Sequence, residues 1–266
     1  MKLAGRVAIV TGSSRGIGKG MALGFAREGA RVVVAARTET PQERLPGTII
    51  QTAAEIEAMG EKALPIRCDV ADEESVENMV QKAVGEWGRI DILVNNAASG
   101  SYLPFQETSL KLWDRVVAVN LRGTFLCTKL VLPHMIERVG GSIINISSVG
   151  AGSIFSQSVS KTRSEPTLMG IPYSVTKAGI ERLSVGLAAE VGRHNIAVNA
   201  LKPARPVLTE ALKLFLPDAD WSQWVSPEGM VRAAIFLAMQ DARGVTGSVA
   251  TDEELILRHG LGAEPE

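Results

Sequence analysis

The sequence contains few cysteines, histidines and aromatic residues. Its 266 residues include 2 cysteines and 3 histidines, and aromatic side chains make up 5% of the chain. Cys68 and Cys127 form no C-x-x-C pair, which argues against a zinc site or a disulfide framework and predicts small core residues. His134, His194 and His259 lack the spacing of metal ligands. We therefore predict no metal site and assign no histidine a role.

An excess of charge of either sign is also missing. The 28 basic and 29 acidic residues give a net charge of -1, so no overall field recruits nucleic acid or an anionic membrane. No apolar run approaches the roughly 20 residues of a membrane span, and the first residues lack a secretory signal. We expect a small-molecule partner, no nucleic acid, no membrane span and a cytoplasmic location.

Hydrophobic residues, in contrast, are plentiful, at 45% of the chain. We therefore expect one compact domain over residues 1–266. Short aliphatic runs alternate with segments of helical period, and these runs cover residues 6–12, 31–37, 62–70, 91–98, 141–148 and 196–201. Strands that are apolar on both faces need cover on both faces. The alternation predicts an α/β fold, a Rossmann-type doubly wound, mostly parallel sheet with helices on both faces.

Three irregular segments interrupt this pattern. Residues 38–49 and 203–228 contain prolines, and residues 150–172 are rich in glycine and serine. Long irregular segments in a compact domain are usually functional. We predict an inserted loop around 150–172 and a substrate-covering lid around 203–228. Trp221 and Trp224 in the lid could cap an apolar substrate or could simply pack the lid, and the sequence leaves both open.

A glycine-rich turn, TGSSRGIG, follows the first aliphatic run and opens a helical segment. Glycines allow the backbone to turn tightly and bring its amides and the helix N-terminus against a pyrophosphate. A glycine-rich turn with nothing bound is the alternative, but the strand–turn–helix context favours a nucleotide site. The residues expected to contact the nucleotide are Gly12, Ser14, Arg15, Gly16, Ile17 and Gly18.

The end of the second aliphatic run bears on which dinucleotide binds. A site for NAD normally has an acidic residue there, whereas an arginine accommodates a 2′-phosphate. Here Ala35 and Ala36 stand where an acid might be, and Arg37 follows. Arg15 could approach the same phosphate. Two guanidiniums and no carboxylate favour NADP(H), although both arginines could be solvent-exposed and NAD(H) stays open.

Polar and small residues at the ends of the third and fourth aliphatic runs extend this site. The aspartate of CDV is placed to meet the adenine, and the asparagines of NNAA could tie neighbouring backbone together. Ordinary turn chemistry is the alternative, because Asn and Asp favour strand ends regardless of ligand. The cofactor contacts predicted here are Asp69, Val70, Asn96, Ala97 and Ala98.

The stretch PYSVTKAG places Tyr173 and Lys177 four residues apart. On a helix they would lie on one face, close enough for the ammonium to act on the phenol. Such pairs also occur on solvated helix faces. A free tyrosine, with a pKa of about 10, is poorly matched to proton transfer at neutral pH. A neighbouring cation favours the phenolate and would correct that mismatch.

Taken in order, TGSSRGIG, CDV, NNAA, VNLRG, NISS and YSVTK resemble the short-chain dehydrogenase/reductase family over about residues 5 to 250. The resemblance implies a seven-stranded sheet and an NAD(P)(H)-dependent oxidoreductase that assembles as a homotetramer or homodimer. It also implies a tetrad of Asn120, Ser148, Tyr173 and Lys177. Ser148 would hold the substrate oxygen, Tyr173 would exchange its proton, and Lys177 would also contact the nicotinamide ribose.

The remaining tetrad member, Asn120, would hold a helix open around a water and extend a proton relay to Lys177. The alternatives are a packing residue for Asn120 and a strand-end cap for Ser148. After the sixth aliphatic run, Pro203 matches a family position and Ala204 replaces the family's glycine. Thr209, one residue further along than the family pattern, is the residue expected to contact the cofactor's carboxamide. With the insertion after Ser148, these departures resemble the hydroxysteroid dehydrogenase-like branch.

The sequence therefore predicts an NADP(H)-dependent oxidoreductase that interconverts a secondary alcohol and a ketone on an apolar substrate, such as an acyl, terpenoid or steroid-like molecule. Two other classes stay open. One is a catalytically silent NADP(H)-binding sensor or scaffold, and the other is a lyase or epimerase that uses the nicotinamide only transiently.

Overall fold

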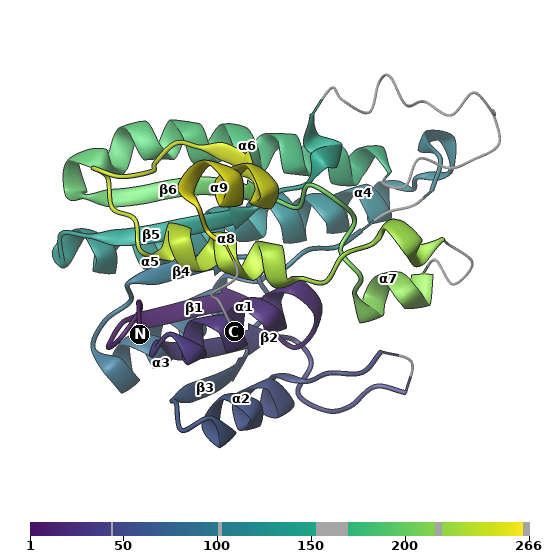
Figure 1. The fold of residues 1–266 in the computed structure, drawn as a ribbon. Helices are drawn as coiled ribbons and strands as arrows, with labels where there is room; N and C mark the ends of the chain where they lie inside the picture. The colour runs from purple at the N-terminus through teal and green to yellow at the C-terminus, as the bar shows by residue number, and fades with distance from the viewer. Residues whose placement is uncertain (44, 101–102, 153–169, 216–219, 263–266) are drawn as a thin grey trace.

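The computed structural model describes residues 1–43, 45–100, 103–152, 170–215 and 220–262. Its seven strands form one sheet in the order β3-β2-β1-β4-β5-β6-β7, in which every pairing is parallel (Figure 1). The strands are β1 Val7–Thr11, β2 Arg31–Ala36, β3 Ala63–Arg67, β4 Ile92–Asn95, β5 Gly141–Ile146, β6 Ile196–Lys202 and β7 Val249–Thr251. The predicted doubly wound sheet is confirmed.

Helices cover both faces of the sheet. One face carries α1 Gly16–Arg27, α2 Ile49–Ala58, α8 Glu228–Ala238 and α9 Asp252–His259, and the other carries α3 Glu73–Trp87, α5 Gly123–Glu137 and α6 Ile171–Val191. The side chains of successive strand residues pack into opposite cores. Ala8 and Val10 pack in the core under the first set of helices, and Ile9 packs in the core under the second set. This alternation is the period of a strand buried on both sides.

Both cysteines lie in the second core, as the sequence predicted. Cys68 and Cys127 are buried and free. Burial raises the pKa of the Cys68 thiol to about 11 and raises that of Cys127 as well. Because the thiolate is the reactive form, neither cysteine is primed for chemistry at neutral pH.

Three consecutive segments on the second face form one continuous helix. It consists of α4 Leu110–Val117, a π-helical turn η2 Ala118–Arg122, and α5, and together they span 28 residues. By length and composition alone this helix is long and apolar enough to cross a membrane. Half of its most apolar window is buried inside the fold, as in a core helix of a soluble protein, which makes it weak support for a membrane span.

The carboxyl ends of all seven strands meet at one edge of the sheet, because the strands are parallel. Figure 1 shows this edge on the right, with α7 Glu210–Phe215 beside it. The described part of the predicted lid consists of α7, a 3-10 turn η6 Trp221–Gln223, and a bridge between Val207 and Val225 that ties the two ends of the segment together. Most of the predicted inserted loop, residues 153–169, lies outside the described residues.

Short 3-10 turns complete the described elements. These are η1 Phe105–Glu107, η3 Val149–Ala151 and η5 Gly192–His194. Of them, η3 matters for the site, since it begins directly after the end of β5 and packs against α6.

Candidate active site

The glycine loop between β1 and α1 is closely packed against the end of β4. A Cβ on Gly12 would lie 2.8 Å from the Cα of Ala97, and a Cβ on Gly18 would lie 2.4 Å from the carbonyl oxygen of Gly12. The side-chain amide of Asn96 donates to the carbonyls of Thr11 and Gly12 at 2.8 and 3.2 Å. Any side chain at Gly12 or Gly18 would therefore push the loop apart. Asn96 ties neighbouring backbone together, as predicted.

Thr11 completes this connection. Its hydroxyl accepts hydrogen bonds from the backbone amides of Asn96 and Ala97 at 3.0 and 3.1 Å and donates to the carbonyl of Val94 at 3.2 Å. One buried hydroxyl thus fixes β1 against the turn that follows β4. This role of Thr11 was not predicted from the sequence, although a threonine directly before the glycine turn was a visible signal.

The N-terminus of α1 receives no capping bond from its own N-cap residue. Arg15 occupies the N-cap position but its side chain makes no capping bond, and the first turn contains no acidic residue. The first amides of a helix are unsatisfied donors and carry partial positive charge, which suits a pyrophosphate. In this structure the amide of Gly16 donates to the carboxylate Oε2 of Glu210 from α7, at 3.0 Å.

Arg15 is engaged by the segment before α2. Its Nε donates to the carbonyl of Pro46 at 2.9 Å and its Nη2 to the carbonyl of Gly47 at 2.8 Å. Gly47 has φ +99°, and a Cβ there would lie 2.4 Å from the carbonyl oxygen of Ser14, so the close approach requires glycine. Burial lowers the pKa of Arg15, and the carboxylate of Glu210 opposes this effect.

The second arginine, Arg37, is exposed just beyond the end of β2. Its Nη1 lies 3.7 Å from Oδ2 of Asp69, and the two side chains are 66% and 41% exposed. Asp69 also accepts a hydrogen bond from the backbone amide of Ala71 at 3.0 Å, a local turn at the end of β3. The structure thus brings these two predicted cofactor residues together at the same edge as the glycine loop.

The other predicted cofactor residues lie at this edge in differing degrees of burial. Ser14 and Val70 are buried, Ile17 is partly buried against the first core, Ala97 and Pro203 are half-buried, and Ala98 is exposed. Thr209 lies directly over the glycine loop, since its Cγ2 is 3.3 Å from the position of a Cβ on Gly16.

Tyr173 and Lys177 lie on one face of α6, as their spacing predicted. Nζ of Lys177 is 5.4 Å from the centre of the Tyr173 ring. Lys177 is only 2% exposed and donates a 2.6 Å hydrogen bond to the carbonyl of Ile146, at the end of β5. Desolvation lowers its pKa to about 8. A buried cation is therefore held beside a phenol.

Asn120 lies in the π-helical turn η2 and is fully buried. Its side chain accepts from the backbone amide of Ser99 at 2.7 Å and donates to the Ser99 carbonyl at 3.1 Å and to the Thr176 hydroxyl at 3.0 Å. Thr176 in turn donates to the carbonyl of Tyr173 at 2.7 Å. Asn120 therefore connects the chain after β4 to the turn of α6 that separates Tyr173 from Lys177.

Ser148 is buried at the end of β5, where it caps η3 by accepting a hydrogen bond from the amide of Gly150 at 3.1 Å. Its neighbour Ser147 donates to Oε1 of Glu181 at 2.8 Å. Nζ of Lys202 lies 3.1 Å from the same oxygen, in a pair whose side chains are 17% and 18% exposed. Glu181 thus joins the ends of β5 and β6 to α6.

Neither Glu181 nor Glu210 was identified from the sequence. Glu181 lies one turn after Lys177, a spacing that could have drawn attention to it. Glu210 directly follows Thr209, but nothing in the sequence indicates that it meets Gly16, because 194 residues separate the two.

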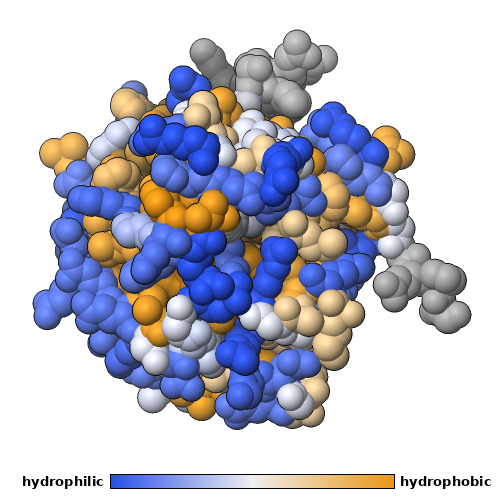
Figure 2. Space-filling view, turned by 90° about the vertical axis from the view of Figure 1, so that its left-hand side faces the viewer, coloured by the Kyte–Doolittle hydropathy of each residue, from blue (hydrophilic) through white to orange (hydrophobic). Residues whose placement is uncertain are grey.

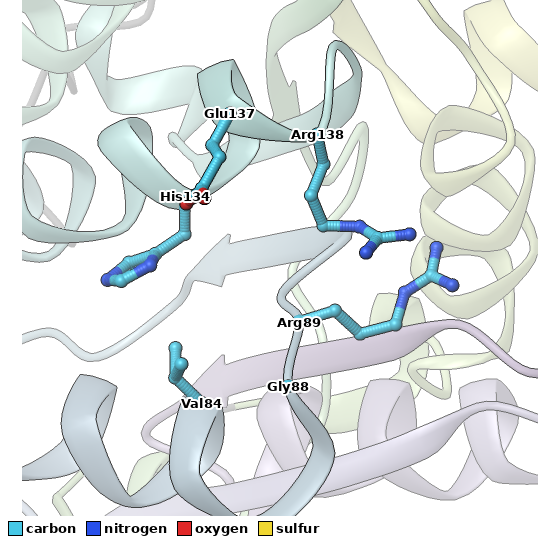
Figure 3. A pocket seen from close by; sticks show the side chains of 6 residues that line it. All are labelled: Val84, Gly88, Arg89, His134, Glu137 and Arg138. Carbon is cyan, nitrogen blue, oxygen red and sulfur yellow. The ribbon is translucent and has the colours of Figure 1, made fainter.

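Two surface cavities lie at the opposite edge of the sheet, shown face-on in Figure 2, where hydrophilic residues are interspersed with small hydrophobic patches. The larger, of about 380 Å³, is lined by Val84, Gly88, Arg89, His134, Glu137 and Arg138 (Figure 3). These residues come from the segments that precede β4 and β5. Ligands of doubly wound sheets bind at the carboxyl ends of the strands, so we do not assign this cavity to the site.

Among the residues that the structure describes, no group of three His, Cys, Asp or Glu side chains could hold a metal ion. The candidate site therefore rests on the glycine loop, the strand ends and α6.

Comparison with known proteins identifies the family. Residues 6–218 match the family described as short chain dehydrogenase. The chain belongs to this family. Its members are oxidoreductases that generally bind NAD(P)(H) and are typically oligomeric. The resemblance stated from the six motifs is confirmed.

Curated relatives agree with the branch expected from the sequence. The chain is 38% identical over 261 residues to hydroxysteroid dehydrogenase-like protein 2 of Danio rerio and 36% identical over 261 residues to that of Homo sapiens. Each alignment covers 98% of this chain, but 60% and 59% of the relatives. The chain thus spans about three-fifths of the length of these curated relatives.

Solved structures share the fold throughout. A short chain dehydrogenase from Mycobacterium thermoresistibile is 33% identical with a TM-score of 0.83, and the match covers 97% of this chain and 88% of that one. A short-chain type dehydrogenase/reductase from Mycobacterium marinum is 31% identical with a TM-score of 0.76 and 94% coverage of both chains.

Proposed function

We propose that this protein is an NADP(H)-dependent oxidoreductase that interconverts a secondary alcohol and a ketone on an apolar substrate. One observation carries the proposal: the buried ammonium of Lys177 lies 5.4 Å from the centre of the Tyr173 ring, at the cofactor edge of the sheet. A cation in this position favours the phenolate. Proton exchange with a substrate oxygen is the step that a dehydrogenase needs from its own side chains.

Tyr173 is the proton donor and acceptor in this proposal. In ketone reduction its hydroxyl gives a proton to the developing alkoxide, and in alcohol oxidation its phenolate takes the proton back. The charge of Lys177 stabilises the phenolate in both directions. Because the pKa of Lys177 is lowered to about 8, the ammonium is present at neutral pH and is lost as the pH rises further.

Ser148 and Asn120 support this exchange. Ser148, at the buried end of β5, would donate a hydrogen bond to the substrate oxygen and hold it beside Tyr173. Asn120, hydrogen-bonded to Thr176 next to Lys177, would extend the proton relay through a water. Both residues thus assist proton transfer at the substrate oxygen and take no part in hydride transfer at the carbinol carbon.

The chain's own residues fit a dinucleotide. The N-terminus of α1, where Arg15 makes no capping bond and the first turn has no acidic residue, suits a pyrophosphate, and Lys177 would donate to the nicotinamide ribose. Exposed Arg37 directly follows β2, and the residues that end this strand, Ala35 and Ala36, are not acidic, which supports NADP(H) over NAD(H). A bound dinucleotide supplies or accepts the hydride at the carbinol carbon.

An apolar substrate is supported by the lid. Trp221 and Trp224 form an edge-to-face pair with ring centres 4.7 Å apart, and Leu214 of α7 is 39% exposed. Aromatic and aliphatic side chains on a segment that covers a site favour substrates with little polarity. Like other members of its family, the protein is proposed to act as a homodimer or homotetramer, which sedimentation would test.

The experiment is a panel of ketones of increasing apolar size, each mixed with the protein and NADPH while cofactor absorbance is followed. Consumption by the wild type, absent with Tyr173→Phe, supports the proposal. NADPH binding without consumption by either protein over the panel would instead favour a binding protein without turnover. Product formation without net cofactor change would favour a lyase or epimerase.

A further inference from the structure

Glu210 links the lid to the glycine loop. It is the first residue of α7, and its carboxylate Oε2 accepts a 3.0 Å hydrogen bond from the backbone amide of Gly16, the first residue of α1. Figure 1 shows α7 beside the start of α1. The two residues lie 194 positions apart in the sequence. Their hydrogen bond holds α7 against the start of α1.

The position of this carboxylate is that of an anion bound to a helix N-terminus. The N-cap residue Arg15 makes no capping bond, and no acidic residue lies in the first turn of α1. Partial positive charge at the first amides therefore attracts an anion from elsewhere. The lid also fills the space over the loop, since a Cβ on Gly16 would meet Thr209 Cγ2 at 3.3 Å and Glu210 Oε2 at 3.8 Å.

We propose that Glu210 occupies the place of the cofactor's pyrophosphate and competes with it for the amide of Gly16. The inference rests on the proposed function, in which the glycine loop binds a dinucleotide. One N–H donor does not serve two anions at full strength, and two anions at one point repel each other. Dinucleotide binding would thus displace Glu210 and free α7, and the carboxylate would lower the apparent affinity for the cofactor.

Glu210 also lies close enough to Arg15 to influence its charge, since its carboxylate opposes the lowering of the Arg15 pKa by burial. The competing explanation is that Glu210 weakens a contact between Arg15 and the 2′-phosphate. The two effects differ in cofactor dependence. The pyrophosphate is common to NADH and NADPH, whereas the 2′-phosphate belongs to NADPH alone.

The test is calorimetric titration of NADPH and NADH into the wild type, Glu210→Gln, Glu210→Ala and the control Glu228→Gln. Glu228 is an exposed carboxylate at the start of α8 and makes no contact with the glycine loop among the described residues. We expect both Glu210 variants to bind each dinucleotide roughly three- to tenfold more tightly, as loss of one charge-assisted competitor predicts. Glu228→Gln should stay within about twofold of the wild type.

An equal gain for the two dinucleotides supports the inference. A gain confined to NADPH assigns the effect to Arg15 and overturns the inference, and so does unchanged or weaker binding of both dinucleotides.

Should the wild type bind neither dinucleotide, the proposed function fails, and titration with inorganic pyrophosphate then decides the inference. Tighter pyrophosphate binding by Glu210→Gln than by Glu228→Gln supports it, and equal binding overturns it. Thermal unfolding of each variant confirms that it is folded.

Discussion

Lys177 donates a 2.6 Å hydrogen bond from Nζ to the carbonyl oxygen of Ile146. The bond anchors α6 to the end of β5, two residues before Ser148, and so fixes three of the four proposed catalytic side chains relative to one another. It also holds an ammonium in a place where only 2% of the residue is exposed. The free energy cost of that burial makes stability depend on pH.

The lysine burial predicts a rise in relative stability at alkaline pH. The pKa of Lys177 falls from an ordinary 10.5 to about 8, a difference worth about 3 kcal/mol. Below pH 8 both folded and unfolded chains hold the proton and the full cost is present. Between pH 8 and 10.5 the unfolded chain binds more proton, so the cost declines.

Lys177→Met removes this titration. We therefore expect the free energy of unfolding of the wild type, measured against that of the variant by urea denaturation, to increase by about 3 kcal/mol from pH 7 to pH 10.5. The comparison cancels titrations that the two proteins share. If the difference between the two free energies of unfolding stays constant with pH, or changes in the opposite direction, the amine of Lys177 is solvated.

Gly18→Ala should disrupt the glycine loop. The added Cβ would lie 2.3 Å from the amide nitrogen of Asn96 and 2.4 Å from the carbonyl oxygen of Gly12, both in a tightly bonded turn. We expect a loss of roughly 1–3 kcal/mol in stability and at least tenfold weaker NADPH binding. Gly85→Ala is the matched control, since its Cβ meets nothing within 4 Å in the exposed face of α3.

The control should stabilise the protein by about 0.5–1 kcal/mol through helix propensity and leave NADPH binding unchanged. Thermal unfolding and cofactor titration measure both variants. If Gly18→Ala and Gly85→Ala have the same stability and the same NADPH affinity, the contacts of Gly18 do not constrain the loop.

Arg37→Ala should change cofactor preference. A charge-assisted contact with the 2′-phosphate predicts at least roughly tenfold weaker NADPH binding, with NADH binding within about twofold. The control is Arg67→Ala, which removes an exposed guanidinium from the end of β3, paired with Glu39 at 3.8 Å. If Arg37→Ala weakens both dinucleotides alike, the arginine does not distinguish the two cofactors.

Glu181→Gln should lower stability more than loss of an exposed ion pair does. The amide still accepts from Ser147, but Lys202 loses the counter-charge of a pair that is less than one-fifth exposed. We expect a cost of roughly 1–3 kcal/mol by urea denaturation. Glu253→Gln, which breaks the 2.7 Å pair with Arg205 at over 50% exposure, should cost less than about 1 kcal/mol. Similar costs would exclude a structural role for the Glu181 carboxylate.

Local patterns were sufficient for much of the fold and for part of the candidate site. Aliphatic runs predicted six strands, because buried parallel strands are apolar on both faces, but β7 is only three residues long and gives no such run. The four-residue spacing placed Tyr173 and Lys177 on one helix face. The π-helical turn at Asn120 interrupts a long helix without breaking its apolar pattern, so periodicity alone did not indicate it.

Contacts distant in sequence were beyond such patterns. The guanidinium of Arg15 bonds to the backbone carbonyls of Pro46 and Gly47, and any residue has a carbonyl, so no side-chain pattern predicts this contact. The meeting of Glu210 with Gly16 depends on how the lid folds back over the sheet. These two contacts lie at the candidate cofactor site, where only tertiary structure brings the segments together.

In the proposed mechanism the phenol of Tyr173, assisted by Lys177, exchanges the proton at the substrate oxygen. Single-turnover kinetics with saturating NADPH and a ketone turned over by the wild type test it directly, using Tyr173→Phe and a separate titration of NADPH affinity. We expect at least roughly a hundredfold slower turnover by Tyr173→Phe than by the wild type, with the dissociation constant for NADPH within about twofold. Turnover within a few-fold of the wild type, at unchanged NADPH affinity, would contradict it.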